Sequence, residues 1–351
     1  MSGLRIVHVV RSDRFAGVEQ FVLRLALAQA DAGHDVQVIG GAADRMAAPL
    51  DAAGAGFAPG LRVGEIAARL RRCAGAVDVV NTHMTAADAA ALRAFAGRHR
   101  PAVVSTRHFA QRRGRFRALP LDPVVRLVLD AEISVSAVVA AAIGAPSTVV
   151  HPGVAVPPAT EHERQRVVLV AQRLQPEKQT MLAIAAFARS GLASDGWRLD
   201  IAGAGAEADE LARAASALGG SAGLLGFRGD IPQLMARAGM LLATAPSEHF
   251  GLTVLEAMAC GLPVVATAAA GHLETMGGLD ERALFPAGDA DAAARALRAL
   301  ADDPSARRRL GDAERARVQS DFSVDAQVAA TDAVYRAAIA RHAGRRKGGA
   351  A

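Results

Sequence analysis

The sequence predicts an α/β protein made of two doubly wound parallel sheets, each flanked by helices. Short apolar runs typical of buried strands alternate with helical patterns along almost the whole chain, which favours parallel strands joined by helical crossovers. The alternation breaks once, in the proline-containing segment 154–160, and then restarts. A chain of 351 residues, 51% of them hydrophobic, is long enough to form two domains.

The first predicted domain covers residues 1–155. It opens on an apolar strand rather than a signal peptide, so we expect a cytoplasmic protein. The predicted strands are 4–10, 35–40, 77–83, 101–106, 131–136 and 147–151, and the predicted helices are 18–32, 65–74, 86–98 and 137–143. The segments 11–17, 41–64 and 107–120 are expected to be loops.

The second predicted domain covers residues 156–323 and follows a linker that contains Pro157, Pro158 and a charged stretch, 161–166. Its predicted strands are 166–171, 197–202, 222–227, 240–245, 263–267 and 282–286, with helices near 179–190 and 207–218. A last helix is expected at 324–342, followed by a disordered tail, 343–351.

Composition excludes several classes of protein. A formal net charge of +5 with only 4% aromatic residues does not indicate a nucleic-acid interface, which needs a basic face with stacking side chains. The longest uncharged run, 133–160, is interrupted by glycines and prolines and therefore does not predict a membrane span. Cys73 and Cys260 lie far apart in helical patterns and are expected to be reduced.

The most informative segment is 246–266. Glu248 and Glu256 are eight positions apart, and Gly251 between them precedes a helix. The free amides of a helix N-terminus bind anionic phosphate, and carboxylates accept hydrogen bonds from sugar hydroxyls. The segment therefore predicts a site for a phosphorylated, hydroxyl-rich ligand. The alternative, for either glutamate taken alone, is an ordinary solvated side chain on a loop or helix.

This segment resembles the E-x7-E signature of retaining glycosyltransferases of family 4, which have the GT-B architecture. The resemblance implies that Glu248 contacts the donor sugar and that Glu256 binds the ribose hydroxyls of the nucleotide. The amides of Leu252 and Thr253, after Gly251, would face the diphosphate. It also implies two Rossmann-like domains that face each other across a cleft, with the final helix packed back on the first domain.

Two cations follow the first strand of the second domain. Arg173 and Lys178 are joined by a turn containing Pro176, and a cationic pair at a strand end can stabilise a departing diphosphate. A salt-bridged surface turn is the alternative on local grounds. The segment is similar to the R-L-x-x-x-K segment of the family, which implies that both residues act in catalysis.

The first domain contains three candidate site residues: a glycine before a predicted helix and two histidines at the ends of predicted strands. Gly17 precedes a helix and matches part of the G-G-x-E pattern of the family, with Ala16 in place of the first glycine, which implies a substrate contact. His83 matches the histidine that reaches the donor sugar in the family, which implies that it is catalytic, although a helix-capping or buried core imidazole is the commoner case for a lone histidine. His108 ends the next strand in the same way.

A basic run follows His108 and contains Arg112, Arg113, Arg115 and Arg117. A solvated loop is the ordinary interpretation of such a run. Contact with a phosphorylated acceptor or with a membrane surface is the other, and the sequence leaves both open.

Two further turns follow strands of the second domain. Phe227 and Arg228 resemble the base-binding segment of the family, where main-chain groups contact the base. Gly203 and Gly205 fit the dinucleotide pattern of NAD enzymes, but they lie in the second strand–helix unit of their domain and lack a well-placed acid. We therefore do not favour an NAD enzyme.

Together these segments predict a retaining glycosyltransferase that moves a hexose-type sugar from a UDP- or GDP-linked donor to an acceptor hydroxyl. The acceptor is left open between a small molecule, a lipid-linked molecule and a saccharide. We expect no metal ion and no cofactor beyond this co-substrate, and at most peripheral contact with the inner membrane face. The alternatives are a sugar-nucleotide epimerase of the same fold and a catalytically silent sugar- or nucleotide-binding protein.

Overall fold

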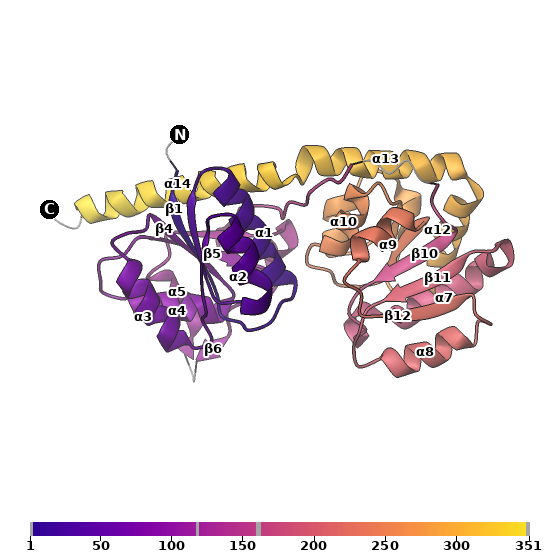
Figure 1. Ribbon diagram of the computed structural model, residues 1–351, viewed down its shortest axis with the longest axis horizontal. Coiled ribbons are helices and arrows are strands. Elements are labelled where there is room, and N and C mark those ends of the chain that lie inside the picture. The colour runs from indigo at the N-terminus through magenta and orange to yellow at the C-terminus, as the bar shows by residue number, and fades with distance from the viewer. Residues whose placement is uncertain (1–2, 117–118, 159–162, 349–351) are drawn as a thin grey trace. The chain divides into compact units, whose positions relative to one another are not determined.

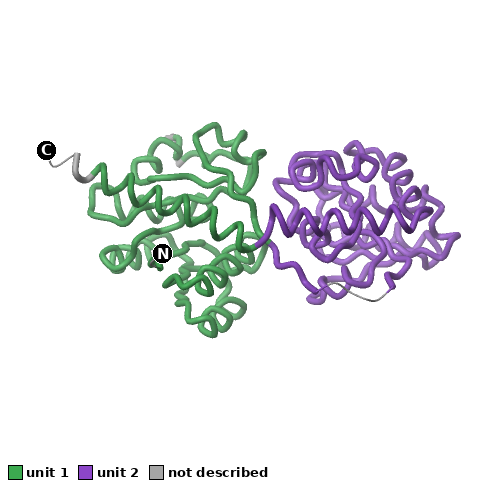
Figure 2. The backbone as a smooth tube through the Cα atoms, turned by 90° about the horizontal axis from the view of Figure 1, so that it is seen from above, with its two compact units in different colours: residues 1–153, 324–351 green, residues 154–323 purple. Residues whose placement is uncertain are grey.

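The computed structural model describes residues 3–116, 119–158 and 163–348, and many of its helices and strands are labelled in Figure 1. The chain divides into two compact units, shown in different colours in Figure 2. Unit 1 comprises residues 1–153 and 324–351, and unit 2 comprises residues 154–323. Part of the charged stretch expected in the linker, 161–162, lies outside the described residues.

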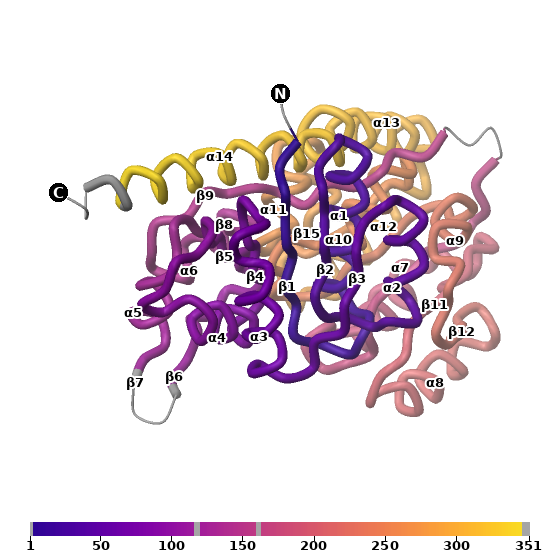
Figure 3. Tube along the Cα trace, turned by 60° about the vertical axis from the view of Figure 1, so that its left-hand side comes forward, coloured from indigo at the N-terminus to yellow at the C-terminus, as the bar shows by residue number. Residues whose placement is uncertain are grey.

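Unit 1 is built on a seven-stranded parallel sheet with the order β3-β2-β1-β4-β5-β8-β9, much of which can be followed in Figure 3. The strands are β1 (Arg5–Val10), β2 (Asp35–Ile39), β3 (Gly56–Ala58), β4 (Val79–His83), β5 (Ala102–Arg107), β8 (Ala131–Ser134) and β9 (Thr148–Val149). The central strands β1, β4 and β5 are buried over nearly their whole length, as is usual for parallel strands covered on both faces, although β4 and β5 end in polar residues. The order reverses between β1 and β4, and ligands of doubly wound sheets bind at such a point, beyond the carboxyl ends of the strands.

The helices of unit 1 are α1 (Gly17–Asp31), α2 (Ala43–Ala52), α3 (Val63–Cys73), α4 (Thr85–Phe95), α5 (Leu121–Arg126), α6 (Ala137–Ile143) and α14 (Val324–Gly348). Helix α14 returns from the far end of the chain and packs against α1, β5 and β8. Its Tyr335 is fully buried, and the Tyr335 hydroxyl accepts a hydrogen bond of 2.6 Å from Asn81 Nδ2 on β4. The helix continues past the expected end at 342, and residues 349–351 of the expected tail lie outside the described residues.

Two segments of unit 1 that we expected to be loops contain regular structure. The segment 41–64 holds α2 and β3: Met46 and Leu50, one helical turn apart, bury one face of α2. The alanines and Pro49 within α2 weaken its sequence pattern, and three residues of β3 are too few to show a strand period. The segment 107–120 contains a short antiparallel pair, β6 (Arg115–Phe116) and β7 (Leu119–Pro120).

Unit 2 contains a six-stranded parallel sheet with the order β12-β11-β10-β13-β14-β15. The strands are β10 (Val167–Ala171), β11 (Arg198–Ala202), β12 (Ala222–Gly226), β13 (Met240–Ala243), β14 (Val264–Thr267) and β15 (Leu284–Phe285). The helices are α7 (Thr180–Ser190), α8 (Ala208–Ser216), α9 (Ile231–Arg237), α10 (Leu252–Ala259), α11 (Ala270–Met276), α12 (Ala290–Asp302) and α13 (Pro304–Asp321), with short 3₁₀ turns at Pro176–Lys178, Leu192–Asp195 and Glu281–Ala283. The strand order reverses between β10 and β13, so the carboxyl ends of these two strands are where a ligand is expected.

The basic run after His108 is not a simple solvated loop, because Arg113 is buried. Its guanidinium pairs with Asp88 at 2.6 Å, with Asp122 at 2.8 Å and with Glu132 at 2.7 Å. Burial alone would lower the pKa of Arg113, but Asp88 and Glu132 outweigh it and hold that pKa above its ordinary value. Arg113 therefore ties its loop to α4 and β8 and is not available to a membrane or an acceptor. Arg117 lies outside the described residues.

Within the described ranges, no helix is long and apolar enough to cross a membrane.

We expect Arg113→Met to destabilise the protein by about 3–5 kcal/mol, because it leaves Asp88 and Glu132 buried without their cation. Urea unfolding of the full chain measures this loss. Arg112→Met is the matched control, since Arg112 is the exposed neighbour in the same run and should change stability by less than about 0.5 kcal/mol. Equal stability in the two variants would contradict the structural role of Arg113.

Candidate functional site

The carboxyl ends of β10 and β13 position Lys178 in unit 2. The backbone carbonyl of Lys178 accepts hydrogen bonds from Gln172 Nε2 at 3.2 Å and from Thr244 Oγ1 at 2.8 Å. Gln172 directly follows β10 and Thr244 directly follows β13, so the 3₁₀ turn that ends at Lys178 is attached to both strands. Lys178 is thereby fixed at the point where the strand order reverses.

Lys178 forms an ion pair with Glu248, with 2.6 Å between Nζ and Oε2. Both side chains are about one-fifth exposed, at 19% and 21%. Burial favours the neutral form of Glu248, but the Lys178 ammonium and its hydrogen bond outweigh burial, so the pKa of Glu248 lies below its ordinary value. The site therefore presents an ionised carboxylate and an ammonium group side by side.

Gly251 leads from Glu248 into α10 and has to be glycine. Its φ is 89°, a value that other residues adopt only at a cost, and an added Cβ would lie 3.0 Å from Cδ2 of His272. The helix then starts at Leu252, and the amides of Leu252 and Thr253 belong to its first turn. Glu256 lies four residues after Leu252, on the same side of α10, and is half-buried.

His272 lies in α11 beside this loop and was not among the residues that the sequence predicts for the site. His272 is buried, and burial lowers its pKa even though Glu248 acts in the opposite direction. Its Nδ1 lies 3.0 Å from Thr267 Oγ1, and that hydroxyl already donates to the carbonyl of Ala245, so the Nδ1–H of His272 donates to Thr267. A glycine and a histidine just after the predicted strand 263–267 were the signal that could have indicated it.

The remaining predicted residues of unit 2 lie in different surroundings. Arg173 is exposed and pairs with Glu177 at 2.9 Å, so it does not share the ion pair of Lys178. Phe227 and Arg228 follow β12, the edge strand two positions from β10, and Phe227 is 79% exposed. Arg228 pairs with Asp230 through two hydrogen bonds, of 2.7 and 2.5 Å.

Gly203 and Gly205, which fit a dinucleotide pattern, have a structural explanation. A Cβ at Gly203 would lie 1.9 Å from the carbonyl oxygen of Gln172, and one at Gly205 would lie 2.0 Å from that of Leu174. The two loops are also joined by a hydrogen bond of 3.0 Å from the Leu174 amide to the Ala204 carbonyl. The glycines therefore allow the loop after β11 to pack directly against the loop after β10.

In unit 1, Gly17 is the first residue of α1, at the carboxyl end of β1. Nothing lies within 4 Å of an added Cβ at Gly17. Ala16, which replaces a glycine of the family pattern, has a φ of −122° and is therefore not strained. Its amide donates to Glu19 Oε2 at 3.0 Å, so Glu19 satisfies the start of α1.

His83 is fully buried, and both of its ring nitrogens are occupied. Its Nε2 lies 3.0 Å from Nδ1 of His8, and its Nδ1 lies 3.0 Å from Nε2 of His108. His108 is only half-buried and is the end of this row that solvent reaches. Of the two histidines that end neighbouring strands, His108 and not His83 is thus exposed to a ligand.

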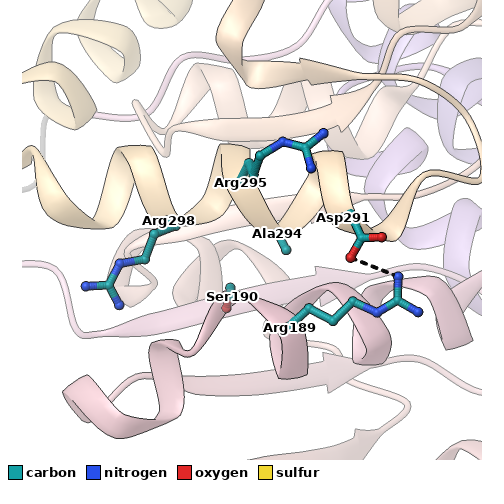
Figure 4. Close-up of a pocket in the computed structure, with 6 residues that line it drawn as sticks. All are labelled: Arg189, Ser190, Asp291, Ala294, Arg295 and Arg298. Carbon is teal, nitrogen blue, oxygen red and sulfur yellow. Dashed lines mark ion pairs between the residues drawn. The ribbon is translucent and has the colours of Figure 1, made fainter.

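A separate pocket of about 280 Å³ lies between α7 and α12 of unit 2 (Figure 4). It is lined by Arg189, Ser190, Asp291, Ala294, Arg295 and Arg298, and Arg189 pairs with Asp291 at 3.1 Å. Helix α7 begins beside Lys178 and ends at Ser190, so this pocket lies at the opposite end of α7 from the Lys178–Glu248 pair.

Among the described residues, no group of three or more His, Cys, Asp or Glu side chains is arranged to hold a metal ion. Asp289-Ala290-Asp291 has the spacing of an Asp-x-Asp motif, but its side chains have other partners. Asp289 accepts a hydrogen bond of 2.8 Å from the Ala292 amide at the start of α12, and Asp291 pairs with Arg189.

Two parallel α/β units, each with its candidate site residues near the carboxyl ends of its strands, are the architecture of the GT-B class. Known structures agree with this fold. Anabaena HepE in complex with UDP and glucose superposes with a TM-score of 0.78 at 20% identity, over 94% of this chain and 99% of that chain. The sucrose-phosphate synthase of Thermosynechococcus elongatus superposes with a TM-score of 0.68 at 20% identity, over 94% and 98%.

Two family models cover most of the sequence. The model "Glycosyltransferase Family 4" matches residues 15–156, and the model "Glycosyl transferases group 1" matches residues 156–317. The chain belongs to glycosyltransferase family 4, glycosyl transferases group 1, and has the GT-B fold, which confirms the family and fold class predicted from the sequence.

Curated relatives match over shorter stretches. The glycogen synthase of Mycobacterium tuberculosis is 34% identical over 183 residues, 49% of this chain and 42% of the relative. The D-inositol 3-phosphate glycosyltransferase of Streptomyces coelicolor is 40% identical over 102 residues, which are 29% of this chain and 22% of the relative. The MMP alpha-(1->4)-mannosyltransferase of Mycolicibacterium hassiacum is 40% identical over 114 residues, which are 32% of this chain and 28% of the relative. The match thus spans less than half the length of each of these relatives.

We expect Lys178→Met to raise the pKa of Glu248 above its ordinary value, because the burial that favours the neutral acid remains while the cation is removed. Titration of the glutamate carboxyl carbons by NMR measures this change. Arg173→Met is the matched control, since Arg173 pairs with Glu177, and should leave the titration of Glu248 unaltered. An unaltered Glu248 titration in both variants would contradict this account of the ion pair.

Proposed function

We propose that this protein is a retaining glycosyltransferase that moves a hexose-type sugar from a UDP- or GDP-linked donor to an acceptor hydroxyl. The observation that carries the proposal is the Lys178–Glu248 pair in front of the start of α10. One ammonium group, one ionised carboxylate and the free amides of a helix start together match the charges and hydroxyls of a sugar diphosphate.

The donor would be held by groups of unit 2. The amides of Leu252 and Thr253 would contact the diphosphate, and Glu256, on the same side of α10, would accept hydrogen bonds from the ribose hydroxyls. Glu248 would accept hydrogen bonds from the hydroxyls of the sugar. The turn at Phe227 and Arg228, whose aromatic ring is exposed, would receive the base.

The chemical step would depend on electrostatic stabilisation of the leaving group. Negative charge builds up on the diphosphate as the glycosidic bond breaks, and fixed cations and amides stabilise that charge without reorganisation. Lys178 is fixed by its carbonyl contacts, whereas Arg173 is exposed and would approach when the donor is bound. With these charges supplied by the protein, we propose that transfer needs no metal ion and that a chelator leaves the rate unchanged.

Unit 1 would supply the remaining contacts through Gly17 and His108. Gly17 leaves open space at the start of α1, where a ligand can approach the backbone closely. His108 is the solvent-exposed end of the hydrogen-bonded histidines His8, His83 and His108, and it would contact a hydroxyl of the sugar or the acceptor. His83 would hold His108 in position through the hydrogen bond between their rings. We therefore transfer the role predicted for His83 to this pair of residues.

The acceptor is proposed only as an alcohol. The names of the curated relatives include both an inositol phosphate glycosyltransferase and a glycogen synthase, so family membership is compatible with small and polymeric acceptors.

The first test is acceptor-dependent release of nucleoside diphosphate. We expect the protein, supplied with UDP- and GDP-hexoses, to release nucleotide only when alcohol acceptors are added, because transfer consumes one donor per hydroxyl glycosylated. Coupled nucleotide detection with a panel of inositol phosphates, lipid-linked alcohols and oligosaccharides measures it. A sugar nucleotide converted to its epimer without acceptor would identify an epimerase. Tight donor binding without any turnover would identify a silent binding protein.

The two glutamates should differ in the step that they affect. Glu256→Ala should weaken binding of the bare nucleoside diphosphate roughly 10- to 100-fold, the scale of a lost hydrogen bond to a charged group. Glu248→Ala should leave that affinity unchanged and impair only the intact sugar donor. Calorimetry with nucleotide and with donor separates these effects, and Glu281→Ala, an exposed glutamate of the same unit, is the control. Equal loss of nucleotide affinity in both site variants would contradict the division of roles.

A further inference from the structure

Three histidines form an uninterrupted hydrogen-bonded row through unit 1. His8 on β1, His83 at the end of β4 and His108 just after β5 are linked ring to ring, with 3.0 Å between the bonded nitrogens at each step. Phe21 of α1 packs its edge against the rings of His83 and His108 and helps to exclude water. His8 and His83 are fully buried.

All three rings are neutral near pH 7. Burial lowers the pKa of His8 to about 4 and that of His108 to about 3, and burial followed by repulsion from His108 and His8 lowers the pKa of His83 well below its ordinary value. A neutral imidazole has one N–H donor and one lone-pair acceptor. The row must therefore have a direction, in which every ring donates toward the same end.

The direction is set at the inner end by Asp332 of α14. An ionised carboxylate only accepts hydrogen bonds, so the Gln29 group 3.3 Å from Asp332 Oδ1 must be the amide nitrogen. The amide oxygen of Gln29 then faces His8 Nε2 at 2.8 Å. The other oxygen of Asp332 lies 2.7 Å from Nε2 of His34, whose Nδ1 accepts the Leu4 amide at 2.9 Å, so the carboxylate is held from both sides.

The orientation of the Gln29 amide determines which nitrogen of each histidine carries the proton. Because Gln29 presents an oxygen, His8 carries its proton on Nε2 and accepts through Nδ1. His83 must then donate from Nε2 to His8 and accept through Nδ1, and His108 must donate from Nε2 to His83. Nδ1 of His108 is left with a lone pair, and within the described part of the chain it has no hydrogen-bond partner.

We propose that Asp332, acting through Gln29, His8 and His83, holds His108 in the Nε2–H tautomer, so that its Nδ1 accepts a hydrogen bond from a ligand hydroxyl and disfavours a phosphate oxygen at that position. The inference rests on the proposed function in one respect, that the hydroxyl belongs to the sugar or the acceptor. Gln29, His8, His83 and Asp332 are positioning residues, since they act on a ligand only through His108.

The direct test is the tautomer of each ring in the full-length protein. Long-range ¹H–¹⁵N correlation spectra of ¹⁵N-histidine-labelled protein at pH 7 should show protonated Nε2 and unprotonated Nδ1 for His8, His83 and His108. A protonated Nδ1 at His108, or a mixture of tautomers there, would overturn the proposal. This measurement needs no variant and no substrate.

Two variants test the origin of the direction. In Gln29→Lys the ammonium group only donates and can pair with Asp332, so it should reverse the row and put the proton of His108 on Nδ1. In Asp332→Asn the side chain can present either an amide oxygen or an amide NH2 to Gln29, so the Gln29 amide is no longer held in one orientation and His108 should show both tautomers. Asp325→Asn, an exposed aspartate of the same helix, is the control and should keep the wild-type spectrum. If either variant folds and keeps His108 wholly in the Nε2–H form, the proposal is overturned, and Asp332→Asn suffices where Gln29→Lys does not fold.

The transfer reaction provides a second readout. Gln29→Lys should lower kcat/KM roughly tenfold, the scale of one lost hydrogen bond, without a change in the Kd of the bare nucleotide. If the tautomers are as expected but no donor is turned over, the proposed function fails and the histidine row stands. If donor is turned over while His108 carries its proton on Nδ1, the function stands and the proposal is overturned.

Discussion

Parallel strands place all their carboxyl ends at one edge of a sheet, and this constraint determines where most of the candidate site residues of this protein lie. In unit 2, Lys178 follows β10, Glu248 follows β13 and His272 follows β14. Residues far apart in sequence therefore come close together, and local contacts of the loops, such as those of Gln172 and Thr244 with the Lys178 carbonyl, fix their final positions. The ion pair of Lys178 and Glu248 joins residues seventy positions apart, and it spans the point where the strand order reverses.

Two groups of buried polar side chains in unit 1 are stabilised in different ways, one by ion pairs and the other by hydrogen bonds between neutral rings. Arg113 stays charged because three carboxylates surround it, and their attraction exceeds the cost of removing the cation from water. The row of histidines has no such counter-charge along its length, so the rings are neutral and are satisfied by donating and accepting in turn. The first arrangement fixes a loop, and the second fixes the orientation of protons.

Helix α14 contributes to unit 1 in two ways. It buries Tyr335 and neighbouring apolar residues against the core, and it brings Asp332 beside Gln29, more than three hundred residues away in sequence. The end of the chain is thus part of the hydrogen-bonded row that leads to His108. In the proposed row, α14 acts on His108 through Gln29, His8 and His83.

The sequence alone determined the class of fold, most strands and the family, because strand periodicity, helix-stop residues and the spacing of Glu248 and Glu256 are local properties. Short or alanine-rich elements such as β3 and α2 escaped it, since they carry too little periodic signal. Only the tertiary structure decided that Arg113 is buried, that His108 rather than His83 reaches solvent and that Asp332 belongs to the same hydrogen-bonded row. Burial and donor–acceptor direction depend on which distant segments become neighbours, and no local pattern in the chain encodes that.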